Sequence, residues 1–377
     1  MTVTHAKPSR VLTGASPPQR VLIVVTRRIG DVLLATPVVR SIRQAWPQTR
    51  IDLLVFAGTE GFVTGNRDVN QVLVVPQRAR FLDHLRFVLR LARRYDLALS
   101  LVPGDRPTLY ACIAGKRRAG LLVPTGKHRW KRALLDAWVP FDDQNTHTVH
   151  MHLALLAALG VPPLREVVAA WTPADERAAT TLLGALGDAP FAVLHAYPQF
   201  RYKMWHEAGW SEIARWLRAH GLSIVLTGGP DSAEREYVSR IAARVPQALD
   251  LCGALSLGAL AFVLTRAAVY VGPDTAITHA AAALGVPTVA LFGPTSPVKW
   301  GPWPAGYAGA ANPWQRRGDQ ALERVRLIQG RAGCVPCLKE GCDGHTASAS
   351  DCLIELSPEI VISALHDLLP SATHHVA

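Results

Sequence analysis

The chain has 377 residues, of which 49% are hydrophobic and 18% are charged, a composition that excludes wholesale disorder and collagen-like repeats. At roughly 100–200 residues per domain, this length favours two domains. The 40 lysines and arginines exceed the 29 aspartates and glutamates, giving a net charge of +11. Such an excess indicates phosphate-bearing partners: nucleic acid, anionic lipid or a phosphorylated glycan.

The positive charge is concentrated in one segment. Residues 78–132 contain 14 basic and three acidic residues, and the rest of the chain carries 26 of each. This distribution argues against a protein that coats nucleic acid along its length. No run of about 18 apolar residues predicts a transmembrane helix, and the first 20 residues, with three prolines and no apolar core, predict a disordered tail and no signal sequence. We therefore expect a cytoplasmic protein.

Strands and helices are predicted to alternate from residue 21 onward. Val21–Thr26 (VLIVVT) is an apolar run typical of a buried parallel strand. Apolar spacing predicts a helix over Asp31–Trp46, between Gly30 and Pro47. Further strands are predicted at Ile51–Phe56, Val72–Val75 and Leu97–Val102, and basic or apolar helices at Phe81–Arg94 and His150–Leu159. This alternation predicts a doubly wound parallel sheet.

A second alternation follows a linker near residues 160–175. Its predicted strands are Ala192–His195, Ser223–Thr227, Val269–Val271 and Thr288–Leu291. Helices are predicted at His206–His220, Ser232–Arg244, Leu257–Arg266 and Thr275–Leu284. We therefore expect an α/β chain with a disordered tail (1–20), two Rossmann-like domains (21–165 and 172–356), a Cys-rich loop (333–352) and a C-terminal helix and tail (357–377). Two such domains facing a cleft would form a site for two substrates.

The turn after the first strand reads Arg27-Arg28-Ile29-Gly30-Asp31. It lacks the G-x-G-x-x-G pattern of dinucleotide-binding proteins. Asp31 at a helix start could simply complement the helix dipole, worth about 0.3–1 kcal/mol. Alternatively it is a general base at the carboxyl edge of the sheet.

Gly272-Pro273-Asp274-Thr275-Ala276-Ile277-Thr278-His279 follows a strand and opens a helix. Free amides at a helix start, together with the Thr275 hydroxyl, could bind a phosphate. His279 lies four residues after Thr275 and shares its face. The alternative is an ordinary capped helix with a satisfied histidine.

Two loops of the second half carry further polar residues. Lys203, in Arg201-Tyr202-Lys203-Met204-Trp205, could neutralise a departing diphosphate, and Asp231, in Gly228-Gly229-Pro230-Asp231, could contact a ribose. Taken singly, a loop lysine is usually solvated and Gly-Gly-Pro-Asp is usually a turn.

In this order, these motifs resemble the lipopolysaccharide heptosyltransferases of glycosyltransferase family 9. The resemblance includes two further stretches, Gly30-Asp31-Val32-Leu33-Leu34-Ala35-Thr36-Pro37 and Leu291-Phe292-Gly293-Pro294-Thr295. The resemblance runs from about Val21 to Cys352, and the opening motif looks most like the heptosyltransferase III branch. It implies the GT-B architecture and a metal-independent, inverting transfer of L-glycero-D-manno-heptose from ADP-heptose to the lipopolysaccharide inner core.

The resemblance also implies residue roles. Asp31 would be the catalytic base and Lys203 would contact the donor diphosphate. Donor-binding residues would be Asp231, Gly272, Asp274, Thr275, Ala276 and His279. The chain departs from the family in having Ala276 where glycine is common and Asp231 where some relatives have glutamate or a shifted loop. No cofactor is implied, and Asp142-Asp143 is expected to cap a turn and not to bind manganese.

Other functions stay open on the residues alone. A family 9 enzyme could use another nucleotide sugar or a protein acceptor. A UDP-sugar 2-epimerase shares the two-domain plan but would not need Asp31, and a catalytically dead scaffold would not need the set Asp31, Lys203 and Asp274. No RNP, KH or helix-turn-helix motif supports nucleic-acid binding.

The basic segment is expected to meet the acceptor, a lipid A/inner-core oligosaccharide, or the anionic inner membrane, to which the protein would be peripheral. The expected acceptor contacts are Arg28, Lys127, Arg129, Lys131 and Arg132. Further candidates are Arg90, Arg93, Arg94, Lys116, Arg117 and Arg118. The alternative is generic solubility charge.

Four cysteines, Cys334, Cys337, Cys342 and Cys352, fall within 19 residues. Clustered cysteines in a cytoplasmic chain favour metal over disulfide. A structural Zn²⁺, reduced thiols and disulfides all remain open.

Overall fold

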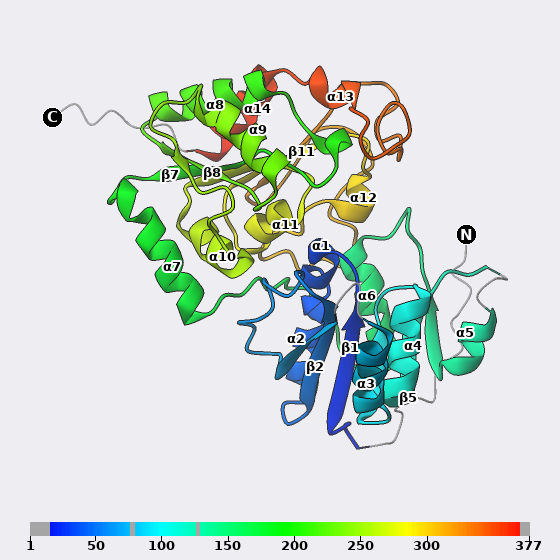
Figure 1. Ribbon diagram of the computed structural model, residues 1–377. Coiled ribbons are helices and arrows are strands. Elements are labelled where there is room, and N and C mark those ends of the chain that lie inside the picture. Colours follow the sequence, from blue (N-terminus) through cyan, green and yellow to red (C-terminus); the bar gives the residue numbers. More distant parts are fainter. Residues whose placement is uncertain (1–15, 76–79, 126–128, 370–377) are drawn as a thin grey trace. The chain divides into compact units, whose positions relative to one another are not determined.

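The computed structural model describes residues 16–75, 80–125 and 129–369. The chain divides into two compact units, and the boundary in the sequence falls between Val168 and Ala169 (Figure 1). Unit 1 precedes this boundary and also includes residues 308–310. Unit 2 contains the rest of the chain after it.

Unit 1 is built on a parallel sheet in the order β3-β2-β1-β4-β5-β6. Its strands are β1 (Arg20–Val25), β2 (Arg50–Phe56), β3 (Gln71–Val75), β4 (Tyr95–Ser100), β5 (Gly115–Leu122) and β6 (Ala137–Pro140). The chain winds from β1 outward to β3, then returns to β4 on the other side of β1. The carboxyl ends of β1 and β4 therefore flank the topological switch point, where doubly wound sheets bind ligands.

The helices of unit 1 connect these strands. They are α1 (Ile29–Leu33), α2 (Thr36–Ala45), α3 (Phe81–Leu91), α4 (Asp105–Ala114), α5 (Arg129–Leu134) and α6 (Thr148–Ala157). The single helix predicted over Asp31–Trp46 is wrong, because the chain breaks between α1 and α2. Pro37 has no N–H to donate to the Leu33 carbonyl, and the Thr36 hydroxyl donates to that oxygen instead, at 2.7 Å.

Unit 2 is built on a second sheet in the order β12-β13-β11-β10-β7-β8-β9, parallel except for β12. Its strands are β7 (Phe191–His195), β8 (Ser223–Thr227), β9 (Leu249–Asp250), β10 (Val269–Pro273), β11 (Thr288–Phe292), β12 (Gln320–Leu322) and β13 (Val325–Gln329). Here β7 and β10 flank the switch point, because β8 and β9 lie on one side of β7 and β10 on the other.

The helices of unit 2 include three that sequence periodicity did not predict, α7, α12 and α13. They are α7 (Pro173–Leu183), α8 (Glu207–Ala219), α9 (Ser232–Ala242), α10 (Leu257–Arg266), α11 (Ala276–Ala283), α12 (Pro297–Trp300), α13 (Asp351–Ile354) and α14 (Pro358–Leu368), with short 3₁₀ turns at Gly184–Leu186 and Arg201–Lys203. These boundaries place each polar motif of the second half between a strand and the following helix.

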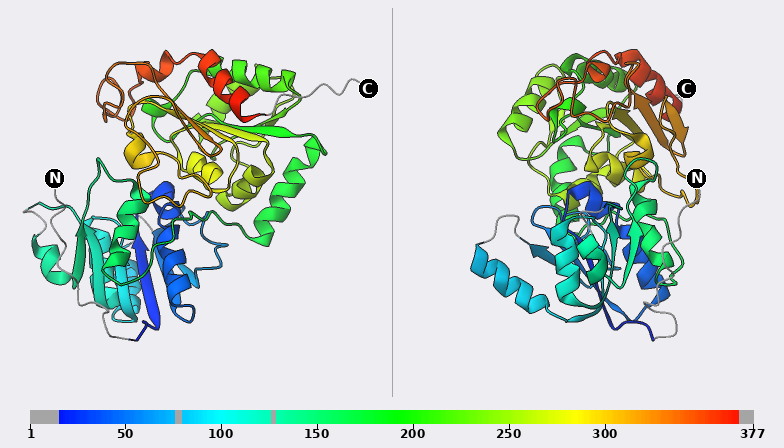
Figure 2. Two further views of the ribbon diagram at one scale, coloured as in Figure 1. Left: turned by 180° about the vertical axis from the view of Figure 1, so that it is seen from behind. Right: turned by 90° about the vertical axis from the view of Figure 1, so that its right-hand side faces the viewer.

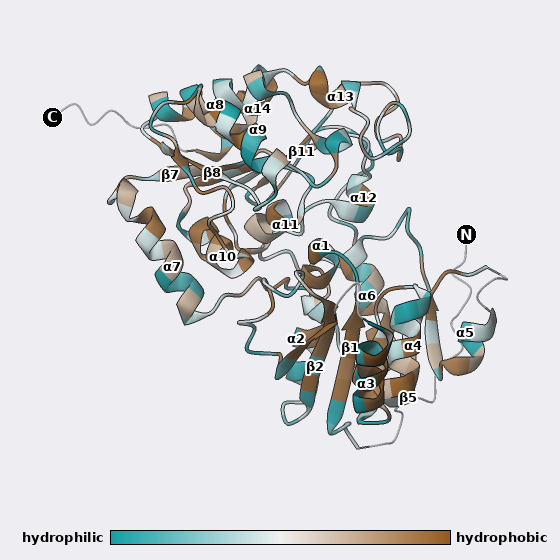
Figure 3. Ribbon diagram, in the orientation of Figure 1, coloured by the Kyte–Doolittle hydropathy of each residue, from teal (hydrophilic) through white to brown (hydrophobic). Residues whose placement is uncertain are grey.

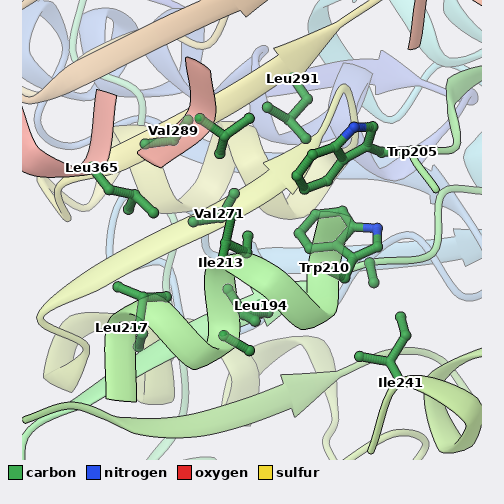
Figure 4. Close-up of a cluster of buried hydrophobic side chains, with 14 of the residues drawn as sticks. Leu194, Trp205, Trp210, Ile213, Leu217, Ile241, Val271, Val289, Leu291 and Leu365 are labelled. Atoms are coloured by element: carbon green, nitrogen blue, oxygen red, sulfur yellow. The ribbon is translucent and has the colours of Figure 1, made fainter. Parts of the chain in front are cut away.

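The core of unit 2 packs α8 and α14 against the central strands (Figure 4). Trp205 and Trp210 are fully buried in it, with ring centroids 5.1 Å apart in a nearly perpendicular arrangement. The indole N–H of Trp205 donates to the Leu356 carbonyl at 2.8 Å, which satisfies its polar atom. This packing fixes the loop that carries Lys203 just before Trp205.

The core of unit 1 is formed by strands that are apolar over most of their length, as the brown β1 and β2 ribbons of Figure 3 show. Val21 to Val25 have no exposed surface. Unlike the tail expected over residues 1–20, Pro18 and Gln19 are ordered: their carbonyls accept hydrogen bonds from Thr49 Oγ1 (2.6 Å) and the Arg50 amide (2.8 Å). Residues 1–15 lie outside the described residues. No helix in the described part of the chain is long and apolar enough to cross a membrane.

Candidate active site

Asp31 is the third residue of the short helix α1, which follows β1 and has Arg28 as its N-cap. Its side chain is 7% exposed, and Oδ1 lies 3.6 Å from Nε of the more exposed Arg27. The structure thus places a buried carboxylate at the carboxyl end of the central strand of unit 1. A carboxylate at such a position could take a proton from a hydroxyl group.

In unit 2, Lys203 and Asp274 come together across the switch point of the sheet. Lys203 Nζ lies 2.6 Å from Asp274 Oδ2 and 3.3 Å from the Asp274 carbonyl oxygen, and donates to both. The two side chains are 17% and 6% exposed. An ammonium group has three donors, so this arrangement leaves one N–H of Lys203 for an anion.

His279 lies one turn into α11, with Nε2 3.9 Å from Asp274 Oδ1. Burial lowers the pKa of its imidazole to about 4, against the opposing effect of the Asp274 carboxylate. The ring is therefore neutral at pH 7. Its Nδ1 is buried without a hydrogen-bond partner among the described residues, which makes this atom available to a bound group.

The start of α11 is capped by Thr275, whose hydroxyl accepts from the Thr278 amide at 3.4 Å. Gly272 is required just before it: a Cβ there would overlap the Tyr270 hydroxyl, which hydrogen-bonds to Thr278 Oγ1 at 2.9 Å. The unbonded amides of the first helical turn and the dipole favour a negative charge at this end. Ala276 is the first residue of the helix.

Asp231, which was expected to contact a ribose, lies in the loop after β8. Asp231 is exposed and caps α9, with Oδ1 accepting from the Ala233 amide at 3.0 Å. The sequence reasoning missed Glu234, which folds back over the loop so that a Cβ at Gly229 would lie 2.8 Å from its Oε2. Burial raises the pKa of Glu234. The signal was present, because an acid three residues after an N-cap is the pattern of a capping box.

The residues expected to contact the acceptor have diverse environments. Arg28 is exposed at the start of α1. Lys127 lies outside the described residues, and Arg129 begins α5. Lys131 does not fit the acceptor contact expected of it, because its side chain is fully buried. Its Nζ lies 2.5 Å from Asp105 Oδ1 and also donates to the Pro103 carbonyl. The Arg132 guanidinium lies over the Trp138 ring at 4.6 Å.

Other basic residues of the segment are neutralised locally. Lys116 lies 2.9 Å from Asp96, and Arg118 lies 3.3 Å from Asp136. The positive charge of residues 78–132 is therefore less available than its count suggests. No ion pair is recorded for the side chains of Arg90, Arg93 and Arg94 within the described segments.

A structural zinc site was one of the three states considered for the clustered cysteines, and it stays a prediction. All four are free thiols, and Cys352 is buried while Cys334 and Cys342 are exposed. Burial, followed by the charges of Cys337, Cys334 and Cys342, raises the pKa of Cys352 to about 12. Across the described ranges, no group of three or more His, Cys, Asp or Glu side chains is placed to hold a metal ion.

Asp142 was expected to cap a turn. Its carboxylate accepts hydrogen bonds from the amides of Gln144 (3.0 Å) and Asn145 (3.1 Å) and from the Thr146 hydroxyl (2.9 Å). It therefore caps a turn.

Two Rossmann-like units in succession, each with polar residues beyond the carboxyl ends of its strands, are the GT-B architecture of glycosyltransferases. The chain belongs to glycosyltransferase family 9, the heptosyltransferase family, whose model matches residues 86–321. This membership confirms the resemblance and the enzyme class predicted from the sequence motifs.

Curated relatives agree with this assignment. The chain is 31% identical to lipopolysaccharide heptosyltransferase 1 of Pseudomonas aeruginosa, covering 90% of this chain and 92% of that protein. It is 28% identical to lipopolysaccharide heptosyltransferase 3 of Escherichia coli, covering 73% of this chain and 83% of that protein.

Solved structures agree with the fold. A family 9 glycosyltransferase from Veillonella parvula superposes with a TM-score of 0.75 at 20% identity, covering 96% of this chain and 99% of that one. E. coli heptosyltransferase WaaC with ADP gives a TM-score of 0.69 at 22% identity, covering 93% and 99% of the two chains. The predicted fold class is thereby confirmed.

Proposed function

We propose that this enzyme transfers L-glycero-D-manno-heptose from ADP-heptose to the inner core of lipopolysaccharide, with inversion at the anomeric carbon and without a metal. The observation that carries the proposal is the Lys203–Asp274 pair, 2.6 Å apart beside the start of α11 in a family 9 chain. Its curated relatives are named as lipopolysaccharide heptosyltransferases 1 and 3, and a solved relative was obtained with ADP-2-deoxy-2-fluoro heptose.

In this proposal Asp31 is the general base. An acceptor hydroxyl oxygen attacks the anomeric carbon of heptose, and the bond from that carbon to the diphosphate oxygen breaks. The hydroxyl proton passes to the Asp31 carboxylate, and the electron pair of the broken bond leaves with ADP. Direct displacement by one nucleophile inverts the anomeric centre. The low exposure of Asp31 supports this role, because a carboxylate removed from bulk water is positioned by the protein.

The donor would bind to unit 2. Lys203 keeps one N–H for a diphosphate oxygen, and the amides at the start of α11, from Thr275 onward, would meet the remaining negative charge. Asp274 holds the Lys203 ammonium in place. The neutral His279, together with Gly272 and Ala276, would shape the pocket for the sugar and its phosphates. Asp231 would contact the ribose through the carboxylate oxygen that does not cap α9.

The acceptor would bind to unit 1, which contains Asp31. The acceptor is the lipid A/inner-core oligosaccharide, whose phosphates and carboxylates suit exposed cations such as Arg28. An enzyme of this kind works on the cytoplasmic side and peripherally to the inner membrane, and we propose that location for this chain.

A donor panel with purified protein tests the proposal. The acceptor is lipopolysaccharide from a heptose-deficient strain, and the donors are ADP-heptose, ADP-glucose, UDP-glucose and UDP-N-acetylglucosamine, with product detected by mass spectrometry. We expect transfer from ADP-heptose that persists in EDTA. Preference for a UDP-sugar would assign a different donor, and loss of activity in EDTA that added metal restores would overturn the metal-free mechanism.

A further inference from the structure

Helix α3 (Phe81–Leu91) carries an apolar face that faces solvent. Leu82, Leu85 and Leu89 are 63%, 42% and 65% exposed, and their spacing of three and four residues places them on one stripe of the helix. The opposite face is the one that packs on unit 1: Leu91 is buried, and Phe87 and Val88 contact the core cluster around Leu22 and Tyr110. The helix therefore has two apolar faces, and among the described residues only the second packs on the core of unit 1.

Positive charge borders the exposed stripe. Residues 80–94 contain five arginines and a single acidic residue, Asp83, which lies 3.6 Å from Arg86. Arg80, Arg90, Arg93 and Arg94 are exposed. On the helical wheel Arg86 and Arg90 lie between the leucine stripe and the packed face. In the right-hand view of Figure 2, α3 (cyan) lies at the margin of unit 1.

A cavity of about 420 Å³ adjoins the carboxyl end of α3, at the amino edge of the sheet. Arg20, Arg50, Arg90 and Arg94 line it, with Phe87 and Leu91 among its apolar walls. Arg50 is engaged, since its Nε lies 3.1 Å from Asp52 Oδ1. No ion pair is recorded for the other three guanidinium groups within the described part of the chain, so the cavity carries uncompensated positive charge.

This cavity lies at the opposite edge of the sheet from Asp31, because Arg20, Arg50 and Tyr95 begin their strands whereas Asp31 follows the end of β1. The feature is therefore separate from the proposed catalytic residues. Exposed leucines bordered by arginines are the pattern of helices that lie in the interface of an anionic bilayer, with apolar side chains among the acyl chains and cations at the head groups.

We propose that α3 is a membrane-docking element of unit 1: Leu82, Leu85 and Leu89 insert into an anionic bilayer, Arg86 and Arg93 contact its surface, and the cavity lined by Arg20, Arg90 and Arg94 receives a lipid phosphate. Charge complementarity selects this occupant. An apolar stripe flanked by five arginines, of which only Arg86 has an ion pair among the described residues, suits neither a neutral bilayer nor a second copy of the same basic helix. The proposal does not depend on the identity of the sugar donor.

Vesicle flotation with the full chain tests this inference. The probes are vesicles of phosphatidylglycerol with phosphatidylethanolamine, and vesicles of phosphatidylcholine alone, at about 0.1 M salt. We expect binding to the anionic vesicles only. The variant Arg90→Gln/Arg94→Gln should weaken it roughly 30-fold, at about one head-group interaction lost per arginine. The variant Leu82→Ser/Leu85→Ser/Leu89→Ser should weaken it at least tenfold by removing the inserted surface.

Matched controls separate this surface from general effects. Leu109→Ser removes another exposed leucine of unit 1, 43% exposed on α4, and Arg67→Gln/Arg177→Gln removes two exposed arginines elsewhere. Both controls should bind vesicles like the wild type, and every variant should keep wild-type affinity for ADP, whose proposed site is in unit 2. Hydrogen exchange should show α3 amides protected by anionic vesicles.

Three results would overturn the inference: equal binding to both kinds of vesicle, undiminished binding by the leucine variant, or loss of binding in the control variants. Self-association without lipid that the leucine substitutions abolish would assign the face to a second copy instead. Because these vesicles contain no lipopolysaccharide, failure here would leave the proposed heptose transfer untouched.

Discussion

Lys203 and Asp274 are 71 residues apart in the sequence, yet Lys203 Nζ lies 2.6 Å from Asp274 Oδ2 in the folded chain. The parallel sheet produces this contact: Lys203 follows β7, Asp274 follows β10, and these strands are neighbours. The pair is mostly buried, so each side chain needs the opposite charge of the other. A lone carboxylate or ammonium at such a position would be uncompensated.

Lys203→Met should therefore have two effects that a second substitution separates. It leaves Asp274 without a counter-charge and should lower the free energy of unfolding by about 3 kcal/mol. It should also weaken ADP binding by at least tenfold, since a charged hydrogen bond contributes about 1.5–3 kcal/mol.

Lys203→Met/Asp274→Asn removes both charges and should recover much of the stability but none of the ADP affinity. Urea denaturation and calorimetry measure the two quantities. If ADP bound normally to either variant, Lys203 would have no role in donor binding and the pair would be structural.

Gly272 should be intolerant of a side chain. A Cβ at this position would lie 2.6 Å from the ring carbon Cζ of Tyr270 and closer still to its hydroxyl, so Gly272→Ala should lower the free energy of unfolding by about 1–3 kcal/mol. Tyr270→Phe alone should cost about 1 kcal/mol, because it removes the hydrogen bond to Thr278 Oγ1.

The double variant Gly272→Ala/Tyr270→Phe should be less destabilised than the sum of the two changes, since removing the hydroxyl makes room for the methyl group. Gly184→Ala serves as the control, because an added Cβ there meets nothing within 4 Å. Equal losses at Gly184 and Gly272 would show that the effect is not steric.

Two buried histidines predict a loss of stability in mild acid. Burial lowers the pKa values of His195 and His279 to about 4 each, whereas unfolded histidine has a pKa near 6.5. Between these values the unfolded chain binds more protons than the folded chain. The stability is therefore fully present above about pH 6.5, falls as the pH decreases toward 4, and changes little from this source below 4.

Each histidine should contribute a slope of about 1.4 kcal/mol per pH unit within that window. His195→Gln and His279→Gln should each reduce the slope measured by urea denaturation at pH 6.5, 6.0 and 5.5, where most carboxylates stay ionised. A wild-type stability that is flat across this range would contradict the buried, neutral state of both rings.

The sequence alone predicted much of the fold because apolar runs and helical periodicity are strong where elements are buried. The strand predicted at Ser223–Thr227 and the helix predicted at Leu257–Arg266 match β8 and α10 in full. The helix α4 and the strand β5 were missed. Strand β5 begins Gly-Lys-Arg-Arg, which is polar, and apart from Gly115 only its second half is buried, so tertiary pairing decides its conformation.

The candidate site was predicted unevenly for similar reasons. The positions of Asp31, Lys203 and Asp274 at the sheet edges could be predicted because each residue follows a buried strand, a position that the strand prediction itself fixes. Lys131 was taken for a surface cation, because charge counting does not show that Asp105 and the Pro103 carbonyl hold it inside unit 1. Glu234 was overlooked because the sequence alone does not show that its side chain lies against Gly229.

Single-turnover heptose transfer by Asp31→Asn measures whether Asp31 is the catalytic base. ADP-heptose is loaded on enzyme in excess over heptose-deficient lipopolysaccharide, and ADP affinity is measured in parallel. Arg27→Ala is the matched control, since its guanidinium lies 3.6 Å from Asp31 but is 40% exposed, and loss of such a pair should change the rate by no more than about twofold. We predict that Asp31→Asn binds ADP like the wild type and transfers heptose about 10²–10⁴-fold more slowly. Transfer by Asp31→Asn at the wild-type rate would show that Asp31 is not the catalytic base.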